Sequence, residues 1–248
     1  MDEILISGKT LPEAYHSALV ALSESGKEVP CPDYGTNQKE ISLTMIISDS
    51  LGEPLISRLF PGGHRALEQY RQEILFGILD FEVARGNWHY TYHDRIAAQI
   101  PQVIQELRRN PYSRRAVIDA RRIDDDWAHD SPACLQHLQY FIRGGKLHSR
   151  ILFRSNDAVK ATFMNAFALI MLQSEIAGEL GVGVGSYSHR ANSFHVYQKD
   201  FDTLDVYCRK IKTMSLSSLT YEYEGDWKIL MEEEQPSIAA MTEELRNR

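Results

Sequence analysis

Cysteine is scarce in this sequence and forms no ligand pattern. Cys31, Cys134 and Cys208 are an odd number with no Cys-x-x-Cys spacing, which argues against both a disulfide framework and a zinc site. Thiols left free in this way are typical of a reducing compartment. We therefore expect a cytoplasmic protein without a structural metal.

Long apolar runs and net positive charge are also absent. No stretch approaches the roughly 20 apolar residues that span a bilayer, and the N-terminal MDEILISGKT carries acids where a secretory signal carries bases. The formal charge is -7, whereas a protein that binds a nucleic acid polymer over a broad face needs clustered cations. These features predict neither a membrane nor a nucleic acid polymer as partner, but they leave a single nucleotide open.

What is present is the composition of an ordinary globular protein. Hydrophobic residues make up 43% and charged residues 25% of the 248, which supplies enough apolar side chains for a sizeable core. No stretch rich in Ser, Gly or Pro separates two halves. Residues 1–248 are therefore expected to form one domain.

Hydrophobic periodicity predicts both helices and strands. Apolar residues at three- and four-residue steps predict helices over 11–23, 67–81 and 100–107, and the nearly all-apolar segment 158–180 predicts a helix buried in the body of the protein. Runs of β-branched and apolar residues predict strands over 41–47, 116–120, 135–142, 147–153 and 186–197. Gly144 and Gly145 lie between two of these strands and predict a hairpin.

Cys134, in the segment SPACLQH, is a candidate nucleophile. A reactive cysteine needs a cationic, partly exposed environment that favours the thiolate. Arg114 and Arg115 precede it and Arg154 follows it, so the chain offers such an environment. The alternative is a small buried residue among solvated charges.

The segment Arg154-Ser155-Asn156-Asp157 groups polar side chains between a predicted strand and the start of the buried helix. Ser, Asn and Asp are good N-caps, so part of the segment could serve only to cap that helix. Arg154 does not fit that role. Guanidinium groups suit bidentate phosphate recognition and helix N-termini attract anions, so the other interpretation is a phosphate pocket.

Asn165 is the polar exception inside the predicted buried helix. An amide there must find partners or cost about 1–3 kcal/mol. It could bond to backbone as a structural residue. Its donor and acceptor could instead read the carbonyl oxygen and imide hydrogen of a uracil edge.

Three further residues are candidates because of the elements they occupy. His195 and Tyr197 stand two apart on a predicted strand, so they face the same side and could hold one polar group such as a sugar hydroxyl, or could serve only in packing. Glu73 lies in an apolar stretch of its predicted helix, where desolvation would raise its pKa and suit it to proton transfer. The alternative for Glu73 is an exposed helix surface.

Four fragments, in this order, resemble the thymidylate synthase and pyrimidine nucleotide hydroxymethylase superfamily: NPYSRR, SPACLQHLQYFIRGGKL, FRSNDAVKATFMNAFAL and SHRANSFHVY. The similarity spans roughly residues 67–207. It implies an α+β fold in which a mixed sheet packs against flanking helices. The other face of the sheet would form the interface of an obligate homodimer with shared active sites.

The resemblance also implies a role for each candidate residue. Cys134 would be the catalytic nucleophile that attacks carbon-6 of a pyrimidine nucleoside monophosphate, Glu73 would organise proton transfer, and Asp157 would lie near folate and pyrimidine. The cofactor would be 5,10-methylenetetrahydrofolate. Substrate binding would fall to Arg154 and Ser155 at the phosphate, Arg114 and Arg115 reaching it from the partner subunit, Gln139 after the nucleophile, Asn165 at the base, and His195 and Tyr197 at the ribose.

The sequence departs from the common pattern of this superfamily at several positions. Leu135 follows the nucleophile where a histidine is common, Lys39 is the one candidate counterpart for the phosphate arginine of the N-terminal loop, and the final AAMTEELRNR lacks the short apolar tail that closes over ligands. These features resemble the shorter archaeal-type and hydroxymethylase branches.

Three reactions follow as alternatives. We expect methylation of dUMP to dTMP. The first alternative is hydroxymethylation of dUMP, dCMP or CMP, in which water quenches the same intermediate, and the second is a catalytically idle relative that binds nucleotides or RNA. Asn165 favours uracil, because hydroxymethylases that act on cytosine nucleotides resemble this sequence but carry aspartate there.

Overall fold

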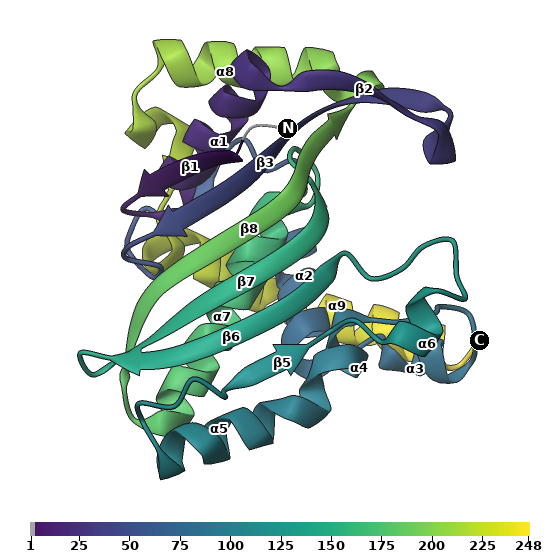
Figure 1. Ribbon diagram of the computed structural model, residues 1–248, viewed down its shortest axis with the longest axis vertical. Helices are drawn as coiled ribbons and strands as arrows, with labels where there is room; N and C mark the ends of the chain where they lie inside the picture. The colour runs from purple at the N-terminus through teal and green to yellow at the C-terminus, as the bar shows by residue number, and fades with distance from the viewer. Residues whose placement is uncertain (1–2) are drawn as a thin grey trace.

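The computed structural model describes residues 3–248 and has a seven-stranded sheet at its centre (Figure 1). The strand order is β1-β3-β8-β7-β6-β5, and β2 pairs with β3. β1 with β3 and β7 with β8 are parallel, whereas the other pairs are antiparallel, which confirms the mixed sheet. The bounds are β1 Glu3–Gly8, β2 Lys27–Cys31, β3 Thr36–Ile47, β5 Val117–Asp119, β6 Leu135–Arg143, β7 Lys146–Asp157 and β8 Gly183–Tyr197.

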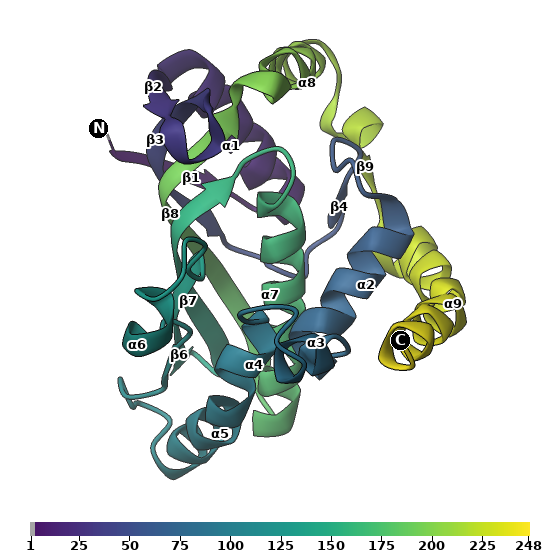
Figure 2. The same cartoon turned by 90° about the vertical axis from the view of Figure 1, so that its right-hand side faces the viewer.

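Helices cover one face of this sheet and leave the other bare. Figure 2 shows α1 (Leu11–Ser25) and α7 (Thr162–Leu180) on the same side of the strands, with α2 (Gly63–Phe76) and α9 (Lys228–Arg246) as a further layer. The remaining elements are α3 Asp80–Ala84, α4 Tyr92–Ile96, α5 Ile100–Arg109, α6 Ile123–Asp126, α8 Phe201–Thr213 and the small sheet of β4 Ile56–Ser57 with β9 Thr220–Tyr221. Within residues 3–248, no helix combines the length and apolar character needed to cross a bilayer.

Register across the strands separates a core face from a polar face. On the covered face, one row of paired residues is Leu43, Ala191, Phe153 and Leu135, and all four are buried. On the bare face, the next row is Leu5, Thr44, Arg190, Leu152 and His137. Because side chains alternate between faces along a strand, the core must lie between the sheet and α7.

α7 is buried along most of its length, as its composition predicted. Its polar residue Gln173 is fully buried and ties the helix to the sheet. The Gln173 side-chain amide donates to the Leu147 carbonyl at 2.7 Å and accepts from the Ser149 hydroxyl at 2.7 Å. The helix that carries Asn165 is therefore fixed against β7 by hydrogen bonds as well as by packing.

The hairpin between β6 and β7 agrees with the prediction. Gly144 and Gly145 form its turn with φ of 56° and 71°, the left-handed region that glycine enters without steric cost. The turn sets the register from the Arg143–Lys146 pair to the His137–Leu152 pair, and an irregularity between Leu135 and His137 then shifts it so that Leu135 pairs with Phe153.

The predicted single helix over 67–81 was wrong in its extent. α2 begins at Gly63 and ends at Phe76, and a second helix, α3, begins at Asp80. Gly77 adopts φ 60°, and a β-carbon there would lie 2.2 Å from His93 Nδ1. A left-handed residue stops an α-helix, so the chain turns at Gly77 although the apolar spacing continues.

The expectation that residues 154–157 form a helix start was also wrong. β7 continues through Asp157, which pairs with His195 of β8, and α7 begins only at Thr162. Parallel pairing with β8 keeps this segment extended. The capping interpretation was wrong as well, because the N-cap of α7 is Ala161 and no side chain caps that helix. Asp157 Oδ1 instead holds the turn before α7 by accepting from the backbone N–H groups of Val159 and Lys160 at 2.9 and 2.8 Å.

We predict that Gln173→Leu lowers the free energy of unfolding by about 1–3 kcal/mol, because it leaves a buried hydroxyl and a buried carbonyl without a partner. Urea denaturation measures the loss. Gln105→Leu on the exposed surface of α5 is the matched control and should change stability little. Equal stabilities for the two variants would contradict the role assigned to Gln173.

Candidate active site

Cys134 lies immediately before β6, where the chain passes from a loop into the sheet. Its carbonyl accepts a hydrogen bond from the Arg154 backbone N–H at 2.9 Å. The pairing of β6 with β7 therefore extends to the cysteine itself. Its side chain is half-buried, which suits a nucleophile that must meet a ligand from outside.

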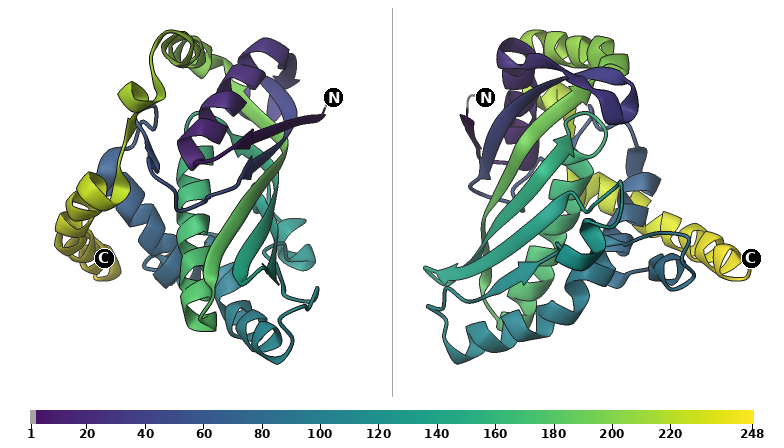
Figure 3. Two further views of the ribbon diagram at one scale, coloured as in Figure 1. Left: turned by 90° about the vertical axis from the view of Figure 1, so that its left-hand side faces the viewer. Right: turned by 45° about the vertical axis from the view of Figure 1, so that its right-hand side comes forward.

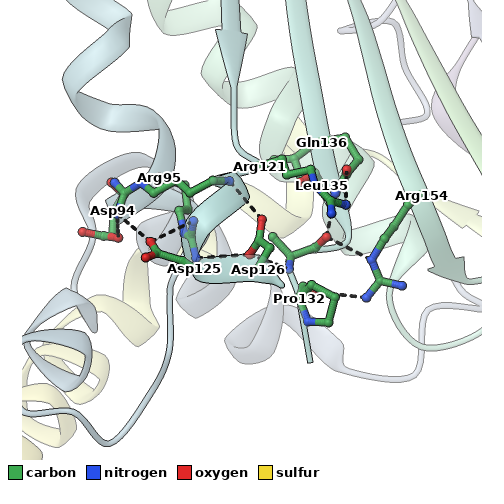
Figure 4. Close-up of polar contacts among 11 residues, drawn as sticks. Asp94, Arg95, Arg121, Asp125, Asp126, Pro132, Leu135, Gln136 and Arg154 are labelled. Carbon is green, nitrogen blue, oxygen red and sulfur yellow. Dashed lines mark hydrogen bonds and ion pairs between the residues drawn. The ribbon is translucent and has the colours of Figure 1, made fainter. Parts of the chain in front are cut away.

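The Arg154 side chain holds the two residues that precede Cys134. Its Nη2 donates to the Pro132 carbonyl at 2.7 Å and its Nε donates to the Ala133 carbonyl at 3.1 Å (Figure 4). A guanidinium carries five N–H donors, so the remaining ones are available for an anion. Arg154 thus fixes the loop that precedes Cys134 and also places a cation beside that loop.

A buried ion pair holds the same loop from its other side. Asp126 Oδ1 accepts from Arg95 Nη2 at 3.2 Å and from the Ala133 backbone N–H at 3.4 Å, while Oδ2 accepts from the Arg122 backbone N–H at 2.9 Å (Figure 4). The side chains of Arg95 and Asp126 are each 1% exposed. Ala133 is therefore held at its N–H by Asp126 and at its carbonyl by Arg154.

Three tyrosines interact electrostatically with the thiol. Burial raises the pKa of Cys134, and the Arg154 cation opposes that rise. Burial also raises the pKa of Tyr90 to about 12 and shifts the pKa values of Tyr70 and Tyr92 in the same direction. These hydroxyls stay protonated at neutral pH, so those of Tyr90 and Tyr92 are donors available to a thiolate or a ligand.

Asn165 and Glu73 meet around one of these tyrosines. The Tyr70 hydroxyl donates to Asn165 Oδ1, and Asn165 is 4% exposed. Glu73 interacts electrostatically with Tyr70. Burial raises the pKa of Glu73, as its sequence context predicted, while a 2.9 Å hydrogen bond from Gln69 opposes the rise.

A second group forms where β7 and β8 end. Ser155 Oγ lies 3.3 Å from His195 Nδ1, and the rings of His195 and Tyr197 are 4.9 Å apart, so the predicted same-side placement is correct. Burial lowers the pKa of His195, which Asp157 partly opposes, and the imidazole is neutral at pH 7. Its buried Nε2 has no hydrogen-bond partner within residues 3–248, which leaves it free for a ligand.

Three predicted substrate residues lie away from Cys134 of their own chain. Arg114 and Arg115 are exposed just before β5, and Gln139 donates to the Arg114 carbonyl at 2.9 Å. β5 pairs with β6 through Val117 and Gln139. At about 3.3 Å per strand residue, the two arginines lie roughly 20 Å from Cys134, so they do not contact the cysteine of their own chain.

The sequence analysis missed the residues that support the nucleophile. Tyr70, Tyr90, Tyr92, Arg95 and Asp126 were not singled out. The alternating tyrosines of HYTYHDR were a usable signal, because polar-tipped aromatics two residues apart beside a helix start rarely serve packing alone. Asp126 gave no such signal, since it sits in an acidic run that is typical of a solvated surface.

A separate hollow of about 310 Å³ lies between α2, α7 and α9. Glu68 and Arg71 line it from α2, on a different face of that helix from Glu73. The buried Glu68 carboxylate is saturated there by Arg71, Gln72 and Gln235. This hollow does not include Cys134.

Comparison with known proteins gives a family and several relatives. A family model described as thymidylate synthase matches residues 71–232. A protein of Methanocaldococcus jannaschii named "Putative thymidylate synthase" is 33% identical over 213 residues, which cover 82% of this chain and 96% of that protein. The thymidylate synthase of Bacillus subtilis subsp. natto is 32% identical over 108 residues, 44% of this chain and 39% of that protein.

The fold is also similar to a solved one. Thermostable thymidylate synthase A from Bacillus subtilis superposes with a TM-score of 0.64 over 81% of this chain and 84% of that chain, at 18% sequence identity. This likeness supports the α+β architecture with a mixed sheet.

We predict that Arg154→Met raises the pKa of the Cys134 thiol, because the nearby cation that favours the thiolate is lost. The pH midpoint for alkylation of Cys134 by iodoacetamide, followed by peptide mass spectrometry, should move upward. Arg108→Met, on exposed α5, removes the same charge elsewhere and should leave the midpoint in place. An unchanged midpoint in Arg154→Met would contradict the assignment.

Proposed function

The chain belongs to the thymidylate synthase family, and we propose that it transfers a one-carbon unit to carbon-5 of dUMP, forming dTMP, with Cys134 as the nucleophile. The observation that carries this proposal is the anchored Cys134 loop, which Arg154 holds and whose thiol interacts electrostatically with three tyrosines. A protein that only bound nucleotides would need neither a fixed thiol nor a cation to ionise it.

The chemistry explains why a thiolate is needed. Carbon-5 of uracil is a poor nucleophile until another group adds at carbon-6. The Cys134 thiolate would form the bond to carbon-6 and push the ring electrons toward carbon-5 and the carbon-4 oxygen as an enolate. Carbon-5 would then bond to the one-carbon unit and lose its proton, and the carrier nitrogen would leave with its bonding electrons to give a methylene at carbon-5. Addition of a hydride to that methylene would expel the thiolate from carbon-6 and restore the ring double bond.

Proton removal from carbon-5 falls to Glu73. A carboxyl group with an ordinary pKa is fully ionised at neutral pH and holds a proton poorly, whereas the pKa of Glu73 is raised by burial. General catalysis is most effective when the pKa lies near the working pH. Glu73, whose carboxyl is half-buried and accepts from Gln69, would act through an ordered water.

Substrate recognition divides among the groups already described. Arg154 and Ser155 would bind the phosphate, Asn165 the uracil edge, and His195 with Tyr197 the ribose hydroxyl. The orphaned Nε2 of His195 supports that last role, because a buried neutral nitrogen without a partner is satisfied once a hydroxyl arrives. A 2′-deoxyribose is the expected sugar.

The donor set fits 5,10-methylenetetrahydrofolate as cofactor. A pterin ring carries N–H donors, and the Oδ2 atom of Asp157 is an acceptor that no hydrogen bond within residues 3–248 uses. Asp157 and Glu73 would therefore hold the cofactor's polar edge. When bound, it supplies the one-carbon unit and, for methylation, a hydride.

We also propose that the enzyme is a homodimer formed through the bare face of the sheet. That face carries an exposed Leu5, 64% exposed, in the same row as Thr44 and Leu152. Burying such a face removes apolar surface from water. It would also bring Arg114 and Arg115 of one subunit to the Arg154 of the other, which completes the phosphate site. The three unpaired thiols fit a reducing, cytoplasmic setting.

Hydroxymethylation is the second candidate, favoured by the position of α9. The last turns form α9, which packs on α2 through Gln235 with Glu68 and Ser237 with Arg65, at 3.0 and 2.7 Å. Figure 3 shows α9 leading away from the sheet. Both reactions share an exocyclic methylene at carbon-5, and admission of water diverts it to hydroxymethyl.

We predict that dUMP with methylenetetrahydrofolate yields dTMP and dihydrofolate, and that dCMP and CMP react far more slowly. Mass spectrometry of the nucleotides and absorbance of the oxidised folate measure the two products. Cys134→Ser should lose turnover yet retain dUMP binding, because a hydroxyl is a far weaker nucleophile of nearly the same size. Hydroxymethyl-dUMP as the main product would instead establish the second candidate, and turnover by Cys134→Ser at the unmutated rate would refute the mechanism.

We predict that two inactive variants restore activity when mixed. Cys134→Ala and Arg115→Ala chains can form a dimer in which one site has both residues intact, so about a quarter of all sites should recover if subunits exchange at random. Fluorescently labelled chains verify the exchange. If exchange occurs and activity stays absent, the arginines do not serve the partner's site.

A further inference from the structure

The hydrogen bond between Tyr70 and Asn165 joins two elements that are far apart in sequence. Tyr70 comes from α2 and Asn165 from α7, and the hydroxyl donates to the amide oxygen Oδ1. Within residues 3–248, Oδ1 is the one hydrogen-bond acceptor recorded for that hydroxyl, and the amide nitrogen Nδ2 has no protein partner. Asn165 is nonetheless 96% buried, at 4% exposure. Nδ2 therefore remains a donor that a bound molecule can use.

This bond decides which way the amide of Asn165 faces. The two ends of an amide differ chemically, because the oxygen accepts and the nitrogen donates. If the amide turned over, Nδ2 would donate to the Tyr70 oxygen and the Tyr70 proton would lose its acceptor. Burial keeps that proton in place, since it raises the pKa of Tyr70 well above its ordinary value. The reversed amide therefore leaves a buried donor unpaired, which is costly.

We propose that Tyr70 is a positioning residue that makes the site selective for uracil over cytosine, by fixing the end of the Asn165 amide that faces the base. This inference rests on the proposed function, in which Asn165 reads the base. It adds a residue on another helix that acts through Asn165 without reading the base itself.

The chemistry of the two bases explains why a fixed amide is needed. Uracil presents a carbonyl acceptor at carbon-4 and an N–H donor at position 3, whereas cytosine presents an amino donor and a ring-nitrogen acceptor. With the amide held by Tyr70, Nδ2 donates to the uracil carbonyl and the second lone pair of Oδ1 accepts from the ring N–H. Cytosine would set donor against donor and acceptor against acceptor. An amide free to turn over would suit either base, so asparagine alone discriminates poorly.

The test compares kcat/KM for dUMP and dCMP in Tyr70→Phe, which removes the hydroxyl and keeps the ring. We expect the ratio of dUMP to dCMP to fall by about tenfold or more, mainly through improved use of dCMP. A loss of folded protein lowers both values equally and leaves the ratio unchanged. Tyr70→Leu is the second variant, with the same expected change, if the Phe variant does not fold.

Two controls isolate the path through Asn165. Tyr140→Phe removes another buried hydroxyl, one without a hydrogen-bond partner within residues 3–248, and should keep the ratio of the unmutated chain. In an Asn165→Ala background, Tyr70→Phe should no longer change the ratio, because the group it orients is gone. An unchanged ratio in both Tyr70 variants, with dUMP still preferred, overturns the inference. An unmutated chain that binds neither nucleotide in calorimetry overturns the proposed function itself.

Discussion

The hydrogen bonds from Arg154 to the chain before Cys134 are the interaction on which the rest of the site depends. A cysteine at the end of a loop would otherwise move with that loop, and a nucleophile displaced by 1 Å loses much of its effectiveness. Here β6 and β7 are paired up to Cys134 itself, and the guanidinium continues that pairing through the carbonyls of Pro132 and Ala133. The Asp126 carboxylate holds the same loop from its other side by accepting a hydrogen bond from the Ala133 backbone N–H.

Arg154 affects the chemistry of the site as well as its structure, because the same guanidinium acts on the Cys134 thiol and on the loop before it. It lowers the thiol pKa against the effect of burial, and two of its donor atoms hold the carbonyls of Pro132 and Ala133. If its remaining donors bind the phosphate as proposed, substrate binding and nucleophile activation are linked through a single side chain. The tyrosines add to this arrangement by surrounding the thiol with hydroxyls that burial keeps protonated.

Some elements of the fold could be predicted from the sequence because local residue preferences determine them, whereas others depend on contacts between distant segments. The β6 to β7 hairpin and the buried α7 were predicted because glycine pairs and apolar composition report local preferences directly. The break at Gly77 was missed, since it depends on a close approach to His93 that apolar spacing does not encode. No prediction was made for β1, α8 or α9, although α8 is amphipathic and its spacing was a usable signal.

The residues of the candidate site differ in the same respect: some could be identified from the sequence and others could not. Cys134, Glu73 and Asn165 stood out because each is chemically unusual for its surroundings, and the structure brings all three around Tyr70. Asp157 was recognised, but its segment proved to be strand, because pairing with a distant strand overrides a local capping pattern. Asp126 and Arg95 could not be found, since a buried ion pair between distant segments leaves no mark on either segment alone.

The central claim is that the Cys134 sulfur adds to carbon-6 of the pyrimidine, and a trapped adduct tests it most directly. A fluorine at carbon-5 replaces the proton that must leave, so the covalent intermediate cannot break down. After incubation with 5-fluoro-dUMP and methylenetetrahydrofolate, peptide mass spectrometry should find nucleotide and folate together on the peptide that contains Cys134. An adduct on Cys31 or Cys208, or no adduct although the nucleotide is bound, would contradict the account.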